Sequence, residues 1–303
     1  MKPQTHKPDW LRAKLPSGAT YHKVNNLLNS LNLATVCREA RCPNMGECWN
    51  GGTATIMLMG DLCTRGCRFC NVKTGHPRGR LDEKEPENTA QAIAQLQLNY
   101  VVLTSVDRDD LPDEGAGHFA KTVSHIKKKA PHLLVEVLTP DFSGRKDCLD
   151  LIIQAGPEVF AHNVETVRRL TPTVRDPRAG YDQSLKVLEW VKKQASSIYT
   201  KSSLMLGLGE TKAEVLETLK DLRAVGCDVI TFGQYLRPAQ RHLPVQKYIS
   251  PEEFENWKYQ AEAMGFLYCA SGPLVRSSYR AGEFFMRSLI ERQRRKAGEL
   301  KGN

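Results

Sequence analysis

Short apolar runs alternate with amphipathic segments along most of the chain. Such alternation predicts buried strands of a parallel sheet, each followed by a helix that covers the sheet. The expected strands are Thr53–Met59, Tyr100–Thr104, Leu133–Thr139, Val159–Val164, Ser202–Leu208 and Asp228–Leu236. The expected helices are Asn88–Leu98, Ala116–Lys129, Lys146–Ala155, Tyr181–Ser196, Thr211–Val225 and Pro251–Met264. Six such units predict an α/β protein with a partial (βα)6 TIM-like barrel.

The two ends of the chain depart from this alternation. Residues 1–36 are predicted to form an extended arm that leads into a helix within Tyr21–Leu33, and a further helix is expected at Glu283–Arg292. We therefore expect an N-terminal extension at residues 1–52, the barrel at residues 53–265 and a C-terminal helical extension at residues 266–303.

The composition is that of a globular protein. With 303 residues, 41% of them hydrophobic and 25% charged, the chain is long enough to bury the core of an α/β barrel. It contains no apolar run of the roughly 18 residues that a membrane span requires. The first ten residues lack the apolar core of a secretory signal. These features predict a cytoplasmic protein without a membrane partner.

The formal net charge of +9 predicts attraction to an acidic partner. Nucleic acid is one such partner, but the basic residues are scattered along the chain, and the densest run, at residues 291–296, is expected to be a solvated helix end. An acidic protein substrate is the other candidate. Charge alone does not decide between these two classes.

Three of the nine cysteines, Cys63, Cys67 and Cys70, follow the first expected strand with C-x3-C-x2-C spacing. Clustered thiols of this kind are typical of metal ligands. Structural zinc sites use paired C-x2-C hooks and four ligands, which this segment lacks. A [4Fe–4S] cluster takes one thiolate per iron, so three cysteines leave one iron open to a substrate. The spacing, with the aromatic Phe69 before the last cysteine, resembles that of radical S-adenosylmethionine (SAM) enzymes.

A second triad, Cys37, Cys42 and Cys48, precedes the barrel. Pro43 and Gly46 are helix breakers, so the triad is expected on a folded loop that a metal would hold in shape. Three unrelated buried thiols are the alternative interpretation of either triad. The remaining cysteines, Cys148, Cys227 and Cys269, are expected to be small core residues.

Polar residues recur at the ends of the expected strands. In parallel barrels the loops after the strands gather at one mouth, where the chemistry takes place. Each residue could equally be an ordinary hydrogen-bonded polar group, but their shared position makes them candidates for binding a cofactor. They are Thr104, Ser105, Asn163, Glu165, Lys201 and Gln234. Further along, Arg276, Ser277 and Ser278 precede the last expected helix, where a serine would normally be an N-cap.

Taken together, these motifs resemble the lipoyl synthase family over nearly the whole length, from Lys7 to Ala281. The C-x3-C-x2-C motif alone indicates the radical SAM superfamily. The second triad and the Arg-Ser-Ser-Tyr motif narrow the resemblance to lipoyl synthases. The other matching segments are residues 104–110, 162–166 and 201–210.

The resemblance implies two [4Fe–4S] clusters. Cys63, Cys67 and Cys70 would hold the cluster whose open iron binds SAM, with the polar residues at the strand ends as its further contacts. An auxiliary cluster would be held by Cys37, Cys42, Cys48 and Ser277. Arg276, beside this serine, is counted among the catalytic residues.

The resemblance also implies an activity. A 5′-deoxyadenosyl radical made from SAM would remove hydrogen from C6 and C8 of an octanoyl chain, and the auxiliary cluster would be consumed as the sulfur source. The octanoyl chain would be carried by a lipoyl domain or a glycine-cleavage H protein, and ferredoxin or flavodoxin would supply electrons. Such carrier domains are often acidic, which suits the charge of this chain.

Three other interpretations remain at this point. Another sulfur-inserting radical enzyme, of the biotin synthase kind, would have no counterpart to the N-terminal triad. A zinc-ribbon protein that binds nucleic acid would have paired C-x2-C hooks. A two-cluster electron carrier would not need a barrel of this size.

Overall fold

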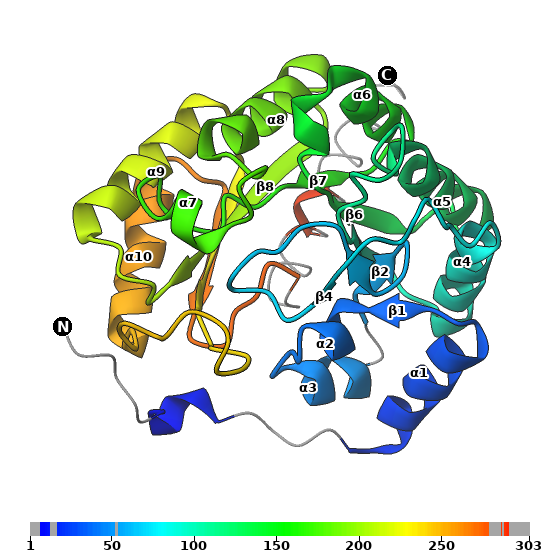
Figure 1. Ribbon diagram of the computed structural model, residues 1–303, viewed down its shortest axis with the longest axis horizontal. Helices are drawn as coiled ribbons and strands as arrows, with labels where there is room; N and C mark the ends of the chain where they lie inside the picture. Colours follow the sequence, from blue (N-terminus) through cyan, green and yellow to red (C-terminus); the bar gives the residue numbers. More distant parts are fainter. Residues whose placement is uncertain (1–6, 13–16, 52–53, 279–285, 287, 291–303) are drawn as a thin grey trace, which may run out of the picture.

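The computed structural model describes residues 7–12, 17–51, 54–278, 286 and 288–290. Within them, helices surround one side of a strongly curved sheet, and the loops that carry the cysteines lie over its inner face (Figure 1). The sheet has eight strands in the order β1-β2-β5-β6-β7-β8-β9-β10. Every neighbouring pair is parallel except β1 with β2.

The strands of this sheet are β1 (Ala34–Thr35), β2 (Ile56–Leu58), β5 (Tyr100–Ser105), β6 (Leu134–Leu138), β7 (Val159–Ala161), β8 (Tyr199–Leu206), β9 (Val229–Gln234) and β10 (Tyr268–Gly272). A small second sheet pairs β3 (Leu62–Cys63) with β4 (Lys73–Thr74). The outer helices are α4 (Glu85–Leu96), α5 (Ala116–Lys129), α6 (Lys146–Gln154), α8 (Tyr181–Gln194), α9 (Lys212–Ala224) and α10 (Pro251–Ala263). The shorter helices are η1 (Asp9–Leu11), α1 (Ala19–Ser30), α2 (Val36–Glu39), α3 (Met45–Asn50), η2 (Phe142–Gly144) and α7 (Thr171–Val174).

All six predicted βα units are present, so the predicted fold class is confirmed. The sheet order begins at β1 and ends at β10, and no pairing joins these two strands within the described residues, so the barrel is partial. Sheet pairing also reaches into both flanking segments. β10 continues the parallel sheet, with Tyr268 opposite Val229, and β1 adds a short antiparallel edge to β2.

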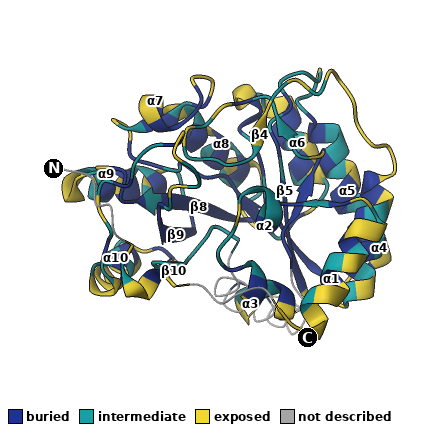
Figure 2. Cartoon of the chain, turned by 60° about the horizontal axis from the view of Figure 1, so that its bottom comes forward, coloured by how far each residue is buried: buried dark blue, intermediate teal, exposed yellow. Residues whose placement is uncertain are grey.

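The pattern of burial explains why these segments fold as they do. Strands such as β2 and β9 are buried along their whole length, as expected for parallel strands covered on both faces. Helix α5 buries Phe119, Val123 and Ile126, which share one face at helical spacing. The helices accordingly turn buried residues toward the sheet and exposed residues outward (Figure 2).

Apolar packing closes the end of the barrel at which the parallel strands begin, opposite the cysteine loops. Tyr100 and Tyr199, at the first positions of β5 and β8, pack with Met286 and Ile290 from near the C-terminus. Residues 286 and 288–290 are helical, and the rest of the predicted helix at Glu283–Arg292 lies outside the described residues. No helix in the described part of the chain is long and apolar enough to cross a membrane.

Candidate active site

A cavity of about 530 Å³ opens at the C-terminal ends of the parallel strands. This is the position at which parallel barrels place their chemistry. Its lining brings together segments that are far apart in the sequence, namely the two cysteine segments, the strand ends and the C-terminal motif. The predicted site residues that line it are Cys42, Cys63, Cys67, Cys70, Thr104, Ser105, Asn163, Glu165, Gln234, Arg276 and Ser277.

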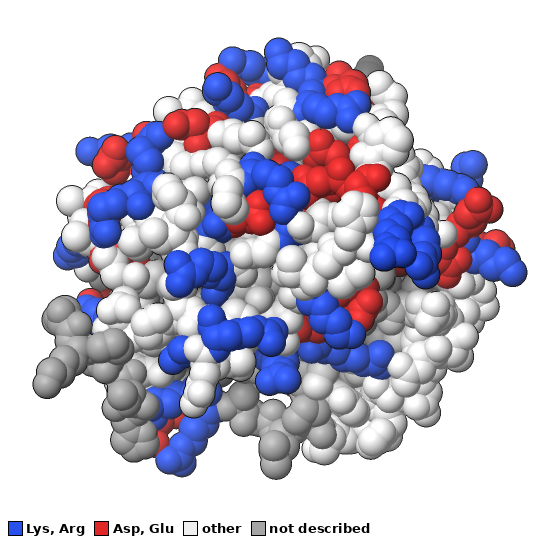
Figure 3. Space-filling view, viewed as in Figure 1, with Lys and Arg blue, Asp and Glu red and all other residues white. Residues whose placement is uncertain are grey.

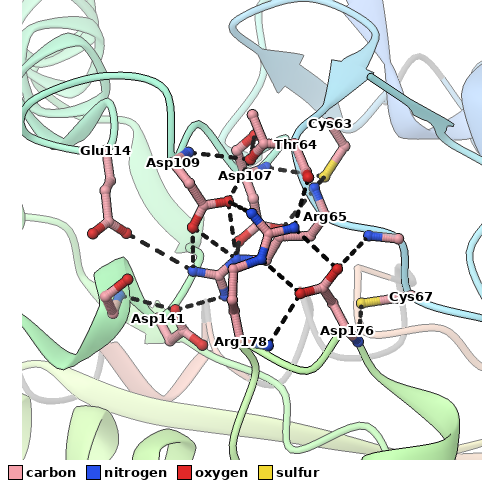
Figure 4. A network of polar contacts seen from close by, with 12 residues as sticks. Cys63, Thr64, Arg65, Cys67, Asp107, Asp109, Glu114, Asp141, Asp176 and Arg178 are labelled. Atoms are coloured by element: carbon pink, nitrogen blue, oxygen red, sulfur yellow. Dashed lines mark hydrogen bonds and ion pairs between the residues drawn. The ribbon is translucent and has the colours of Figure 1, made fainter. Parts of the chain in front are cut away.

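The loop that carries Cys63, Cys67 and Cys70 is held from one side by the segment between α7 and α8. Arg68 donates its backbone N–H to the carbonyl of Val174 at 2.9 Å. Gly66 donates its backbone N–H to the carboxylate of Asp176 at 2.7 Å, and Arg178 pairs with the same carboxylate at 2.8 Å (Figure 4). These bonds fix the loop independently of any bound group.

The thiols of this loop accept backbone hydrogen bonds. Cys63 Sγ accepts from the N–H of Arg65 and from that of Asp107, both at 3.4 Å, and Cys67 Sγ accepts from the N–H of Asp176 at 3.3 Å. Burial raises the pKa of Cys63 and of Cys67 to about 12, and for Cys63 the neighbouring Asp107 raises it further. Metal ions bind thiolates and not thiols, so these cysteines would ionise readily only together with a bound cation.

The N-terminal triad lies on two short helices rather than on a continuous loop. Cys37 belongs to α2 and Cys48 to α3, with Cys42 between them, so the expectation of an irregular loop was wrong in this detail. Gly46 lies inside α3, while Pro43 stands in the break between the helices. Of the three thiols, that of Cys42 faces the shared cavity.

Two asparagine side chains tie this triad to the rest of the site. Asn44 donates through Nδ2 to the carbonyl of Leu274 at 2.7 Å, which links the triad to the C-terminal segment. Asn71, next to Cys70, donates through Nδ2 to the carbonyl of Glu39 at 2.9 Å. Both ligand segments and the Arg-Ser-Ser motif therefore meet at one cavity.

The strand-end residues differ in the free hydrogen-bonding capacity they offer. Within the described residues, four buried polar atoms on the cavity wall have no hydrogen-bond partner: Ser105 Oγ, Thr139 Oγ1, Asp141 Oδ2 and Asn163 Oδ1. Buried polar atoms are normally hydrogen-bonded, so this wall fits a polar ligand.

Two of the predicted cofactor-binding residues have other partners. Gln234 donates to three backbone carbonyls and accepts from the N–H of Ile249 at 2.8 Å, so it supports the loop before α10. Lys201 does not line the cavity. It lies two residues before Ser203 on β8, one layer deeper in the barrel, where its side chain is 3% exposed and pairs with Glu136 at 2.7 Å.

Comparison with known proteins identifies the family. The model of the radical SAM superfamily matches residues 57–222, and that of the N-terminal domain of lipoyl synthase matches residues 2–42. The chain is 61% identical over 291 residues to the mitochondrial lipoyl synthase of Schizosaccharomyces pombe, covering 94% of this chain and 79% of that protein. It is 57% identical over 294 residues to the lipoyl synthase of Myxococcus xanthus, covering 97% and 98%. The chain belongs to the lipoyl synthase family.

Solved structures support the fold of this lipoyl synthase family member. Methylornithine synthase superposes with a TM-score of 0.55 at 16% identity, covering 82% of this chain and 77% of that one. At this identity the similarity concerns the fold alone. Membership of the family makes the chain a radical SAM enzyme, and the superfamily implies a [4Fe–4S] cluster and SAM as cofactors.

The side chains of this lipoyl synthase family member fit those cofactors. Cys63, Cys67 and Cys70 are free thiols of one loop and all three line the cavity. Within the described residues, no group of three His, Cys, Asp or Glu side chains is arranged to hold a single metal ion. A four-iron cluster takes one thiolate per iron, so its ligands stand apart from one another.

Sequence reasoning missed several residues that line the site, above all Arg175. Its side chain is buried, donates to Ser184 Oγ at 2.8 Å and forms no ion pair with any described carboxylate. Asp141, which was also missed, lines the cavity, as do Asp107 and His162 from the matching segments 104–110 and 162–166. Burial raises the pKa of Asp107 to about 6, although Arg65 opposes the rise. These residues stand in irregular loops without periodicity, so only strand-end position could have indicated them.

Proposed function

We propose that the chain inserts two sulfur atoms, at C6 and C8, into a protein-bound octanoyl chain. One observation carries this proposal. A single cavity is lined by the thiols Cys63, Cys67 and Cys70, by Cys42 of the second triad and by Ser277. An enzyme that makes a radical at one cluster and takes sulfur from another needs both ligand sets around one substrate.

The proposed ligands fall into two sets. Cys63, Cys67 and Cys70 would hold the SAM-binding cluster, and Cys37, Cys42, Cys48 and Ser277 would hold the auxiliary cluster. When bound, the first would supply the electron that cleaves SAM to a 5′-deoxyadenosyl radical, and the second would supply the sulfur. In that second set Ser277 is the one hard oxygen ligand among soft thiolates, so it is the ligand that is most readily displaced. Arg276, half-buried beside Cys42, places a positive charge next to this set.

We divide the chain into three parts according to the proposed cluster ligands that each part carries. Residues 1–52 would carry the auxiliary thiols, residues 53–265 the radical SAM barrel, and residues 266–303 the serine ligand. The bond from Asn44 to Leu274 supports a shared role of the first and last parts.

The residues of the cavity wall would bind SAM. Arg175 is a buried cation without a carboxylate partner among the described residues, which suits the carboxylate of SAM. Ser105 Oγ and Asn163 Oδ1 have free hydrogen-bonding capacity for its polar groups, and Thr104 and Glu165 lie beside them on the wall. The low solvent access of this wall would keep water from the radical.

The substrate would be an octanoylated lipoyl domain or glycine-cleavage H protein. Lys7, Arg41 and Arg237 are exposed and line the cavity, and Figure 3 shows Lys and Arg side chains across the middle of this face. Such a surface favours an acidic carrier. Ferredoxin or flavodoxin would be the electron donor, and a cytoplasmic location stays a prediction.

Variants of the two triads test the proposal. In Cys63→Ala we expect no SAM cleavage, measured as 5′-deoxyadenosine. In Cys42→Ala we expect cleavage to continue while no lipoyl product appears in the mass spectrum of an octanoylated carrier domain. Cys148→Ala is the matched control, because this buried thiol lies on α6 outside the cavity.

Metal analysis gives an independent readout. The anaerobically reconstituted wild type should hold about eight irons and as many sulfides, and either triad variant about four. Equal loss of cleavage in both folded variants, or a lipoyl product from Cys42→Ala, would contradict the proposed division of labour.

A further inference from the structure

Beneath the loop of Cys63, Cys67 and Cys70 lies a largely buried network in which carboxylates outnumber cations. The Arg65 guanidinium, with a side chain 2% exposed, lies 2.8 Å from a carboxylate oxygen of Asp109 and 2.8 Å from one of Asp141. It also approaches Asp107 at 3.3 Å and Glu114 at 3.8 Å. Figure 4 shows these side chains converging on Arg65 from several loops.

Arg178 reaches Asp109 at 3.3 Å, but its side chain is 49% exposed and its charge is therefore screened by solvent. One buried cation thus faces four carboxylates. An excess of charge with low solvent access is costly. The 174–178 segment also holds the loop, through the backbone N–H groups of Arg68 and Gly66.

Two members of this network lie directly against a proposed cluster ligand. Asp107 Oδ2 lies 3.5 Å from Cys63 Sγ, while the other carboxylate oxygen of Asp107 faces Arg65 Nε at 3.3 Å. The backbone N–H groups of Asp107 and Arg65 both donate to that same sulfur, each at 3.4 Å. The Asp107 carboxylate is therefore held beside one ligand atom, and the Arg65 guanidinium is held against that carboxylate.

We propose that Arg65 and Asp107 are positioning residues that together set the reduction potential of the cluster on Cys63, Cys67 and Cys70. Adding an electron to the cluster becomes harder with a carboxylate beside its ligand sulfur and easier with a buried guanidinium paired to that carboxylate. The Asp107 charge lowers the potential and the Arg65 charge raises it. The proposal rests on the proposed cluster ligands and does not depend on the octanoyl substrate.

The test is a redox titration of the reconstituted full chain, followed by electron paramagnetic resonance. Each measurement is made without the carrier domain at about pH 8, where free carboxylates are ionised. We expect Arg65→Gln to shift the midpoint of the SAM-binding cluster downward and Asp107→Asn to shift it upward. The auxiliary cluster of each variant serves as an internal reference whose midpoint stays at the wild-type value. Arg178→Gln, in the same network but half exposed, should give a much smaller shift.

The rate of SAM cleavage gives a second readout. With a fixed reductant, Arg65→Gln should cleave SAM about tenfold more slowly with an unchanged KM for SAM, since the electron transfer and not the binding is impaired. Arg65→Lys keeps the charge and should return the potential toward the wild-type value.

Opposite shifts in the two variants are the decisive result, because structural damage to the loop would move both in the same direction. Shifts of the same sign, or no shift in variants that keep their iron, would overturn the proposal.

A changed KM for SAM in Asp107→Asn at an unchanged potential would assign that carboxylate to substrate binding instead. Loss of the cluster from both variants would show that the pair is structural. If the wild type makes no lipoyl product while the two variants still show opposite shifts, the proposed function alone is refuted.

Discussion

The backbone carbonyl of Val275 lies in the space that a side chain on Gly233 would fill. A Cβ at Gly233, in strand β9, would stand 2.2 Å from that carbonyl oxygen, well inside van der Waals contact. Val275 directly precedes Arg276 and Ser277. The missing side chain therefore lets the C-terminal motif lie against the sheet at the edge of the cavity.

Replacing this glycine should disturb the auxiliary site alone. In Gly233→Ala the new methyl group must push the backbone at Val275 outward and carry Ser277 with it. We expect the variant to lose most of its lipoyl product and part of its auxiliary iron, while SAM cleavage continues. Gly180→Ala is the control, since its Cβ would come no closer than 3.4 Å to any neighbour. Full auxiliary iron and normal product in Gly233→Ala would show that the motif can shift without loss of function.

The bond between Asn44 and Leu274 should contribute to stability. Asn44 is 4% exposed, and its Nδ2 donates to the carbonyl of Leu274 at 2.7 Å. In Asn44→Leu this carbonyl loses its partner, which should lower the free energy of unfolding by about 1–3 kcal/mol. Thermal or denaturant unfolding measures the change, and Asn29→Ala on the exposed surface of α1 should leave it nearly unaltered. Equal stability of the two variants would mean that water replaces the bond.

The buried pair of Lys201 and Glu136 should act on stability and not on cofactor binding. Lys201→Met leaves the Glu136 carboxylate, 2% exposed, without its cation, and the expected loss is about 3–5 kcal/mol. The double variant Lys201→Met with Glu136→Gln should recover much of it. The KM for SAM should remain at the wild-type value, because Lys201 is absent from the cavity wall. A raised KM in the stable double variant would instead support the original expectation that Lys201 binds the cofactor.

Periodicity was enough to predict the barrel, but not the depth of a residue within it. The six βα units follow from alternating apolar patterns, and the thiol spacing marks Cys63 and Cys42 as candidate ligands without any structure. Lys201 and Ser203 point to the same side of β8, yet only the second reaches the cavity. The depth of each residue depends on how neighbouring strands are shifted relative to one another, and a local sequence pattern does not contain this information.

Residues in irregular loops were beyond sequence reasoning for a related reason. Arg175 directly follows the short helix α7 and lines the cavity, and the contact of Asp107 with Cys63 joins segments 44 residues apart. The C-terminal serine could be placed from the family resemblance but not from its own context, which equally suited a helix cap. Long-range contacts such as that of Asn44 with Leu274 determine which of these residues reach the cavity, and local sequence does not reveal them.

The imidazole of His242 should hold the last ligand of the C-x3-C-x2-C loop in place. His242 is 7% exposed. Its Nδ1 accepts a hydrogen bond from the N–H of Ala239 at 3.2 Å, so the proton of the neutral ring is on Nε2. Nε2 donates this proton to the carbonyl of Cys70 at 2.9 Å. Removing the ring in His242→Ala leaves that carbonyl unpaired and frees the backbone at Cys70. We expect a chelator to remove the SAM-binding cluster several times faster than in the wild type. The loss is followed as the decay of the cluster's visible absorbance. In the control variant His125→Ala, on the exposed face of α5, the cluster should decay at the wild-type rate. The auxiliary thiols belong to another part of the chain, so the decay of the auxiliary cluster should be unaffected. An equal acceleration of both decays would point to general unfolding instead.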